Sequence, residues 1–301
     1  MMPDKESHFK VVALMGKVGS DLVKNTIEQL VTWLEARDVK VILEADTAAF
    51  IINLNLQVKS IEVIGGICDL VIVVGGDGCL LGAGRALAKH EVPILGVNRG
   101  RLGFLADVLP SELEHRMEEV FKGDYQVENR FLLNASLENQ GKLIFSADAV
   151  NDVVLHPGQA VQMIEFELYI EGNFVFRQRS DGLIIATPTG STAYALSAGG
   201  PMVHSTLEAI TLVPICPHTL SNRPIVVHAA SEIKVTFCDV QGTTPLVSCD
   251  GQSSIEFSPG DVLYVRRKSQ PMRLLHPLDY DFYAACRSKL GWASKLIQEP
   301  E

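Results

Sequence analysis

Strand and helix patterns alternate at the start of the sequence, and this alternation constrains the fold more than any other feature. Residues 9–15 and 39–43 are short apolar runs of the kind that predicts buried strands. Between them, apolar residues from Leu22 to Leu34 recur at the spacing of one helix face. A strand, a helix and a further strand in this order predict two parallel strands joined by a crossover helix.

The alternation continues to about residue 130 and then gives way to short strands. Residues 70–74 form a third apolar run, a helical pattern follows it, and a later helix is expected to end at Gly123. Glu171-Gly172-Asn173 is typical of a hairpin turn, and residues 191–198 of one short helix. Further strands are expected at residues 131–138, 163–170, 174–177, 183–186, 225–230, 232–237 and 262–266.

These patterns divide the chain into two domains of different class. We expect an α/β domain with a parallel sheet over residues 1–130. A mostly-β, sandwich-like domain is expected over residues 131–276. A last helical pattern, from Asp279 to Leu290, lies within residues 277–301, and we expect this helix to return to the first domain.

Composition excludes several classes of function. The chain has 26 Lys and Arg against 36 Asp and Glu, a net charge of −10, which disfavours nucleic-acid polymers and anionic membranes as partners. The longest charge-free run, 182–207, contains Pro188 and Pro201, so we expect no membrane span there. The six cysteines show no C-x-x-C spacing and the chain begins without a signal-peptide pattern, so we expect a cytoplasmic protein.

The third strand leads directly into Gly75-Gly76-Asp77-Gly78, the most informative turn of the sequence. Glycines let the backbone approach a ligand closely, and a helix that starts here would direct N–H groups at a phosphate. Asp77 would then accept a proton or hold a metal ion that bridges phosphates. A tight turn with an exposed Asp is the simpler interpretation. A dinucleotide fingerprint is disfavoured because its third glycine, Gly82, comes one residue late.

Three further segments carry polar groups suited to a nucleotide. Residues 187–194 supply hydroxyls, a glycine and a helix start, although an ordinary helix cap would need the same residues. Asn151-Asp152 can bind an amine and sugar hydroxyls or simply cap a turn. Arg179 and Asp181 can bind a charged ligand or form a surface ion pair.

In this order, the segments closely resemble the bacterial NAD kinase (ATP-NAD kinase) family. The resemblance spans nearly the whole chain, and the stretch from Arg179 to Pro201 is its most specific part. The matching residues are Gly75–Gly78, Asn98–Leu105, Asn151-Asp152, Arg179–Gly182, Ala186–Pro201, Asp250–Gln252 and Arg287–Leu290.

The resemblance implies both an architecture and a reaction. It implies a Rossmann-like α/β domain followed by a β-sandwich-like, NAD-binding domain. It also implies transfer of the ATP γ-phosphoryl group to the 2′-hydroxyl of the adenosine ribose of NAD, which gives NADP and ADP. A divalent metal, usually Mg²⁺, and a homodimer or homotetramer belong to the same expectation.

Site residues are carried over only where the motif matches. The resemblance implies that Asp77 is the general base for the 2′-hydroxyl and that the turn of Gly75, Gly76 and Gly78 binds phosphate. The implied NAD-binding residues are Asp77, Gly78, Asn151, Asp152, Arg179, Asp181, Thr192, Ala193, Tyr194, Ala195, Leu196, Ser197 and Gln252.

Two departures from the family pattern and two alternative functions remain at this point. Cys79 stands where relatives often carry a hydroxyl or amide, and Gln162 stands where they often carry His or Arg. A lipid kinase shares the Gly-Gly-Asp-Gly turn, but nothing like the Arg179–Pro201 stretch is expected in one. A non-catalytic nucleotide sensor is disfavoured because the candidate base is present.

Overall fold

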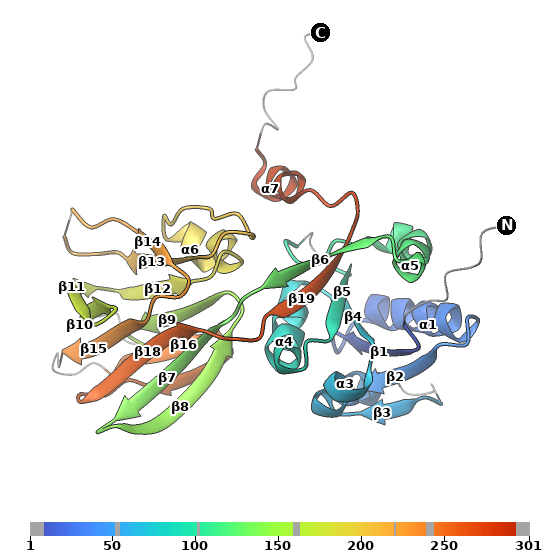
Figure 1. Cartoon of the computed structure of the whole chain (residues 1–301), viewed down its shortest axis with the longest axis horizontal. Helices are drawn as coiled ribbons and strands as arrows, with labels where there is room; N and C mark the ends of the chain where they lie inside the picture. The colour runs from blue at the N-terminus through green and yellow to red at the C-terminus, as the bar shows by residue number, and fades with distance from the viewer. Residues whose placement is uncertain are drawn as a thin grey trace, which may run out of the picture. The chain divides into compact units, whose positions relative to one another are not determined.

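The computed structural model describes residues 9–51, 55–100, 103–158, 163–219, 221–238 and 244–292. The chain forms two compact units, shown in Figure 1. The first comprises Met1–Asn129 and Met272–Glu301, and the second comprises Arg130–Pro271. Each unit is described separately below.

The first unit is built on a seven-stranded, mostly parallel sheet in the order β3-β2-β1-β4-β5-β19-β6. The pairs from β3 to β19 are all parallel. The strand order reverses between β1 and β4, which is where open α/β sheets usually bind ligands. The strands are β1 (Val11–Gly16), β2 (Lys40–Glu44), β3 (Gln57–Lys59), β4 (Leu70–Gly75), β5 (Pro93–Asn98), β6 (Tyr125–Arg130) and β19 (Met272–Pro277).

Helices connect these strands, as the alternating pattern predicts. Ile27 and Leu30 of α1 are fully buried in the same core cluster as Leu14 and Ile72 of the sheet. Helix α5 ends at Gly123, whose φ of 87° is the left-handed conformation expected at a helix end. The helices are α1 (Asp21–Glu35), α2 (Ala45–Phe50), α3 (Ile61–Ile67), α4 (Asp77–Leu87), α5 (Leu113–Lys122) and α7 (Phe282–Leu290), with short 3₁₀ turns at Ala88–His90 and Pro110–Glu112.

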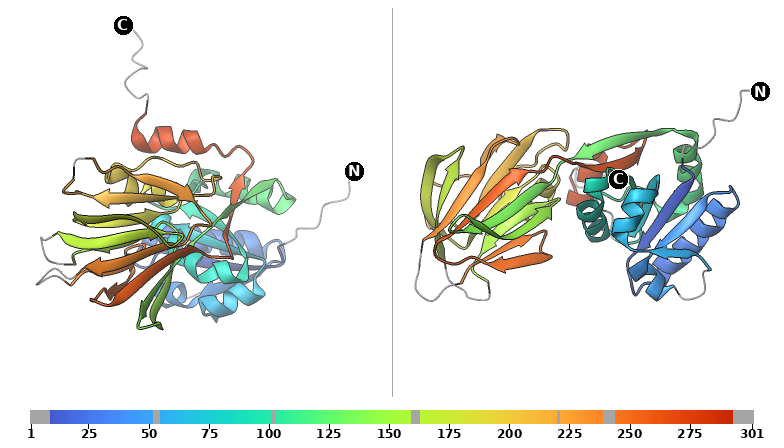
Figure 2. Two further views of the ribbon diagram at one scale, coloured as in Figure 1. Left: turned by 60° about the vertical axis from the view of Figure 1, so that its left-hand side comes forward. Right: turned by 60° about the horizontal axis from the view of Figure 1, so that its bottom comes forward.

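The second unit packs two six-stranded antiparallel sheets, in the orders β11-β10-β15-β18-β7-β8 and β14-β13-β12-β9-β16-β17. Phe166 of one sheet and Leu183 of the other belong to one buried core, which makes the unit a sandwich. In both views of Figure 2 this unit consists mostly of strands. They are β7 (Leu133–Asn139), β8 (Lys142–Ala149), β9 (Asp152–His156), β10 (Ile164–Ile170), β11 (Asn173–Ser180), β12 (Gly182–Ala186), β13 (Ala209–Ile215), β14 (Ile225–His228), β15 (Ile233–Cys238), β16 (Leu246–Cys249), β17 (Ser253–Glu256) and β18 (Asp261–Arg267).

The predicted fold class, α/β followed by mostly β, is confirmed, and two local features refine it. Glu171 and Gly172 have φ of 51° and 72°, so the predicted hairpin turn between β10 and β11 is present. The short helix expected over residues 191–198 is instead a 3₁₀ turn, Gly190–Thr192, and α6, Tyr194–Ser197. Ala193 interrupts it because its ψ of −127° is not helical. No helix in the described ranges is long and apolar enough to cross a bilayer.

The chain returns to the first unit earlier than residue 277, where the sequence places the boundary. Strand β19, absent from the sequence prediction, pairs in parallel with β5, so the return begins at Met272. Its sequence, Met272-Arg-Leu-Leu-His-Pro, includes a charged and an ionisable residue, which hides the apolar pattern of a buried strand.

The ionisable residue of β19, His276, is fully buried between two carboxylates. Its Nδ1 contacts Asp107, its Nε2 lies 3.1 Å from Glu128 of β6, and its ring stacks on Tyr280. Burial alone would lower the pKa of His276, but the contacts with Asp107 and Glu128 outweigh burial and raise it above 6.5. The imidazole therefore joins β19 to β6 and to the segment that holds Asp107.

Replacing His276 with Asn is expected to destabilise the protein, and to do so more at pH 6 than at pH 9. Because the folded-state pKa is raised, the stabilisation is complete below the unfolded pKa of about 6.5 and is lost as pH rises through the folded-state value. The variant removes the imidazole that lies between Asp107 and Glu128, so its melting temperature should fall by about 5–10 °C at pH 6 in a calorimetric scan.

The matched control is His115→Asn. The His115 side chain is 72% exposed and lies 3.4 Å from Glu119, so its loss should change the melting temperature little at either pH. An equal loss at pH 6 and pH 9 for His276→Asn would contradict a protonated His276.

Candidate active site

Asp77 is the first residue of α4, immediately after the turn that ends β4. One oxygen of its carboxylate accepts a hydrogen bond from the backbone N–H of Phe104 at 2.8 Å. The other accepts from the N–H of Leu105 at 3.2 Å. The Nζ of Lys289 lies 3.6 Å from Oδ2. The carboxylate is therefore fixed in one orientation by three groups of the same unit.

Gly103 makes this arrangement possible. A Cβ atom at residue 103 would overlap the carboxylate of Asp77, so a glycine is required for the close approach of the backbone. The stretch Asn98–Leu105, quoted above for its family resemblance, thus holds the candidate base. Arg101 and Leu102 of this stretch lie outside the described residues.

A cavity of about 320 Å³ opens beside the glycine turn, in the first unit. Gly78, Cys79 and Gly82 of α4 line one wall, and Lys17, which follows β1, lies on another. The cavity includes residues at the ends of β1 and β2, at the edge of the sheet where the strand order reverses. Burial raises the pKa of the Cys79 thiol, so the thiol in this wall stays neutral.

The second unit contains a cavity of about 430 Å³ that brings four predicted site residues together. Asn151 and Asp152 lie at the start of β9, and Ala193 and Tyr194 lie at the start of α6. Asp250, Gly251, Ser248, Val154 and His156 complete the described lining.

Asp250 fixes the backbone of the Asn151-Asp152 pair. Its carboxylate accepts hydrogen bonds from the N–H groups of Val150 at 3.0 Å, Asn151 at 2.8 Å and Asp152 at 3.2 Å. Asp250 and Gly251 have φ of 49° and 64°, so they form the tight turn between β16 and β17. The hairpin turn therefore carries the carboxylate to the site.

The hydroxyl-rich turn holds the same pair from the other side. Thr187 donates its backbone N–H to the carbonyl of Asn151 at 2.8 Å and its hydroxyl to the carbonyl of Val150 at 2.6 Å. A Cβ at Gly190 would overlap the Asn151 backbone, so glycine is required there as well. The conformation of Asn151 is set by backbone contacts on both sides.

Asp152 is buried, with an exposed fraction of 5%. Burial raises its pKa to about 7, and the Asp250 carboxylate adds to the rise. The group therefore exchanges its proton near neutral pH. A buried carboxylate that is easily protonated can accept hydrogen bonds from sugar hydroxyls once it is ionised.

The described residues contain no cluster of three or more His, Cys, Asp or Glu side chains that could hold a metal ion. The Asp77 carboxylate already contacts two N–H groups and Lys289, and Glu44 accepts three hydrogen bonds from Asp46 and Thr47 at the start of α2. A divalent ion would need to bring most of its ligands with a nucleotide.

Two family models together cover most of the chain. Residues 12–125 match the ATP-NAD kinase N-terminal domain, and residues 150–276 match the ATP-NAD kinase C-terminal domain. The chain belongs to the ATP-NAD kinase family.

Individual relatives agree with this assignment. An NAD kinase from Ectopseudomonas mendocina is 55% identical over 288 residues, which are 96% of this chain and 98% of the relative. One from Marinobacter nauticus is 54% identical over 96% of this chain and 98% of its own length. A crystal structure of yeast NADH kinase complexed with NADH has a TM-score of 0.89 at 26% identity and covers 98% of this chain and 91% of its own. An Archaeoglobus fulgidus NAD kinase in complex with ATP has a TM-score of 0.69 at 28% identity and covers 93% and 97%.

The remaining predicted NAD-binding residues of this ATP-NAD kinase stay predictions. Arg179 is in β11, Asp181 lies between β11 and β12, and Gln252 follows the Asp250-Gly251 turn. Of the described residues, the lining of the larger cavity does not include Arg179, Asp181, Thr192, Ala195, Leu196, Ser197 or Gln252. Gln162, one of the departures from the family pattern, lies outside the described residues.

Sequence reasoning missed three residues that shape the site. Gly103, Asp250 and Lys289 all lie within motifs quoted for the family resemblance, but none was assigned a role. An Asp-Gly pair signals a turn, which could have located Asp250. The contacts of Gly103 and Lys289 with Asp77 are distant in sequence, so no local pattern indicates them.

Replacing Asp152 with Asn is expected to stabilise the unliganded protein at pH 8. Because the folded-state pKa is about 7 and the unfolded value about 3.8, the proton stabilises the fold fully below about pH 4, and this contribution is lost as pH rises through 7. Above pH 7 the wild type must bury a charge that the amide avoids. A calorimetric scan should show a melting temperature higher by about 5 °C at pH 8, with the difference shrinking at pH 5.

The control is Asp148→Asn. The carboxylate of Asp148, on β8, forms an ion pair with Lys268. That variant should not be stabilised at pH 8. The melting temperature of Asp152→Asn is compared with that of the wild type at each pH. A gain that is smaller at pH 8 than at pH 5, or a loss at pH 8, would contradict the assigned pKa of Asp152.

Proposed function

We propose that this chain transfers the γ-phosphoryl group of ATP to the 2′-hydroxyl of the adenosine ribose of NAD, with Asp77 as the general base. One observation carries the assignment of the base: the Asp77 carboxylate is fixed by Phe104 and Leu105 at the start of α4, next to the glycine turn. The family membership of the chain supplies the reaction class.

Asp77 accepts the proton of the 2′-hydroxyl while the hydroxyl oxygen bonds to the γ-phosphorus. The bond from that phosphorus to the β,γ-bridging oxygen breaks, and ADP leaves with the electron pair. Phosphoryl transfer depends mainly on positioning and on neutralising charge, and a positioned base contributes roughly 10²–10⁴-fold.

The donor phosphates are assigned to the first unit. Backbone groups of Gly75, Gly76 and Gly78 bind them at the start of α4, where the helix dipole favours negative charge. Lys17, which lines the adjacent cavity, adds a cation. The divalent ion, which we take to be Mg²⁺, enters as part of the nucleotide substrate, because Mg²⁺ is commonly bound through substrate phosphates and few carboxylates.

Most residues proposed to bind the acceptor dinucleotide belong to the second unit, and Asp77 and Gly78 of the first unit are proposed with them. Asn151 and Asp152 hold ribose hydroxyls and an amide, and Ala193 and Tyr194 form part of the adenine-side wall of the same cavity. The remaining residues proposed for this function are Arg179, Asp181, Thr192, Ala195, Leu196, Ser197 and Gln252. The ionised form of Asp152 is the one that accepts hydroxyl hydrogen bonds, so NAD binding should strengthen as pH rises through 7.

The setting of the reaction is proposed from the same family. We expect the protein to act in the cytoplasm as a homodimer or homotetramer, with no nucleic-acid polymer or membrane as partner. The alternative function of lipid kinase is disfavoured, because both domain models match NAD kinases across residues 12–125 and 150–276. A non-catalytic sensor is disfavoured because Asp77 is present and oriented.

Replacing Asp77 with Asn tests the assigned base. The amide keeps the size of the side chain but cannot accept the hydroxyl proton, so turnover should fall by about 10²–10⁴-fold. The dissociation constant for NAD, measured by calorimetric titration, should change by less than about threefold. Turnover is measured as NADP formation at saturating ATP and NAD.

Asp69→Asn serves as the control, because that carboxylate accepts hydrogen bonds from Lys10 and Val11 at the start of β1. It should retain turnover close to wild type in folded protein. Wild-type turnover in Asp77→Asn would show that another group accepts the proton.

A further inference from the structure

We propose that Lys289, on the C-terminal helix α7, is a positioning residue that holds the Asp77 carboxylate in the orientation needed for catalysis. The proposal rests on the role of Asp77 given above and extends it to a residue at the other end of the chain. It gives the C-terminal helix a part in the reaction beyond packing.

The ammonium group of Lys289 lies close both to the Asp77 carboxylate and to Phe104, the residue that donates a hydrogen bond to it. Its Nζ lies 3.6 Å from Asp77 Oδ2 and 4.9 Å from the ring centre of Phe104. The same Oδ2 accepts the backbone N–H of Phe104 at 2.8 Å. The lysine, the carboxylate and the residue that donates to it therefore form one cluster, in which the cation also faces an aromatic ring.

The two side chains are 27% and 29% exposed, so the pair is only partly screened by solvent. An ammonium group at this distance attracts the carboxylate, and partial burial makes the attraction stronger than at an open surface. It therefore restricts the rotamers available to Asp77, the side chain that must accept a proton.

Specific contacts start helix α7 and hold it on the first unit. Asp281 caps the helix by accepting the N–H of Tyr283 at 2.8 Å, and Cys286 in the middle of the helix is fully buried. Just before the helix, Asp279 pairs with Arg116 of α5 at 2.8 Å, which holds the preceding segment on the first unit.

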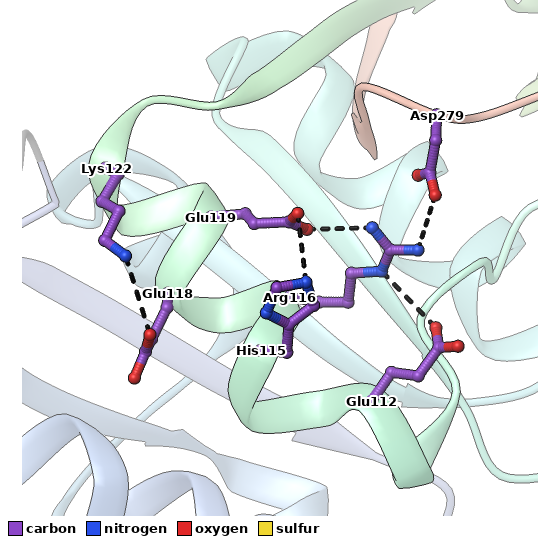
Figure 3. A network of polar contacts seen from close by, with 7 residues as sticks. All are labelled: Glu112, His115, Arg116, Glu118, Glu119, Lys122 and Asp279. Atoms are coloured by element: carbon purple, nitrogen blue, oxygen red, sulfur yellow. Dashed lines mark hydrogen bonds and ion pairs between the residues drawn. The ribbon is translucent and has the colours of Figure 1, made fainter.

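Arg116 is itself held by two further carboxylates, as Figure 3 shows. Its Nε lies 3.4 Å from Glu112 and its Nη1 lies 2.9 Å from Glu119. The hydrogen bond from Arg116 holds the pKa of Asp279 below its usual range. A network of this kind is worth more than an isolated surface pair, so it fixes the point from which α7 departs.

Other ionisable groups near this end of the sheet are already accounted for. Cys79 stays a neutral thiol because burial raises its pKa, and Lys17 lies beside that thiol in the donor cavity. Arg99 donates its Nε–H to the hydroxyl of Thr26 at 2.5 Å. Among the ion pairs of the described residues, Lys289 is the cation that contacts Asp77.

The test compares Lys289→Met, which keeps the length of the stem without the charge, with Lys289→Arg and with Arg287→Gln. Arg287 lies on the same helix and pairs with Asp281, so its replacement removes the same charge elsewhere on α7. We expect Lys289→Met to lower kcat about tenfold with little change in KM for NAD.

The charge-conserving and control variants should behave differently. Lys289→Arg should recover most of kcat, and Arg287→Gln should match wild type. In the background of Asp77→Asn, adding Lys289→Met should cost nothing further, because a residue that acts through Asp77 has no effect once Asp77 is gone. If Lys289→Met does not fold, as judged by its thermal melt, Lys289→Gln replaces it.

The outcomes separate this proposal from the one on which it rests. Wild-type turnover in Asp77→Asn alone would overturn the assignment of the base. Loss of turnover in Asp77→Asn together with wild-type kcat in Lys289→Met would overturn the role of Lys289 only. An additive loss in the double variant would also overturn it, since Lys289 would then act independently of Asp77.

Discussion

The contact of the Asp77 carboxylate with the backbone N–H groups of Phe104 and Leu105 is the constraint on which the first unit's chemistry depends. A parallel strand delivers Asp77 to the edge of the sheet, and the helix that follows begins with that residue. The contact then requires a glycine at residue 103, because any Cβ there would overlap the carboxylate. One hydrogen-bonded carboxylate thus explains why two separate motifs must fold against each other.

In the second unit, too, a carboxylate that accepts backbone N–H groups fixes a loop of the candidate site. The Asp250 carboxylate accepts backbone N–H groups from Val150 to Asp152, and Thr187 holds the other side of that segment. Here the clamped backbone shapes a cavity and leaves Asp152 buried with its pKa raised to about 7. In one unit a clamp orients a proposed base, and in the other it presents a proposed ligand to sugar hydroxyls.

The sequence predicted the features that depend on local patterns. Apolar spacing predicted α1 and the strands beside it, and glycines predicted the end of α5 and the hairpin at Glu171-Gly172. Strand β19 was missed because Arg273 and His276 interrupt its apolar pattern, although His276 is buried between carboxylates that only the fold brings together. The roles of Gly103, Asp250 and Lys289 were missed because the groups that they contact lie far away in the sequence.

The most direct test of the whole account is the identity of the phosphorylated product. The purified chain is incubated with ATP, Mg²⁺ and an equimolar mixture of NAD and a diacylglycerol, and the products are examined by ³¹P NMR. The account predicts one new phosphomonoester, on the 2′-oxygen of the adenosine ribose of NAD, with loss of the ATP γ-phosphate signal. Phosphorylation of the lipid, of another ribose hydroxyl, or of neither acceptor would contradict it.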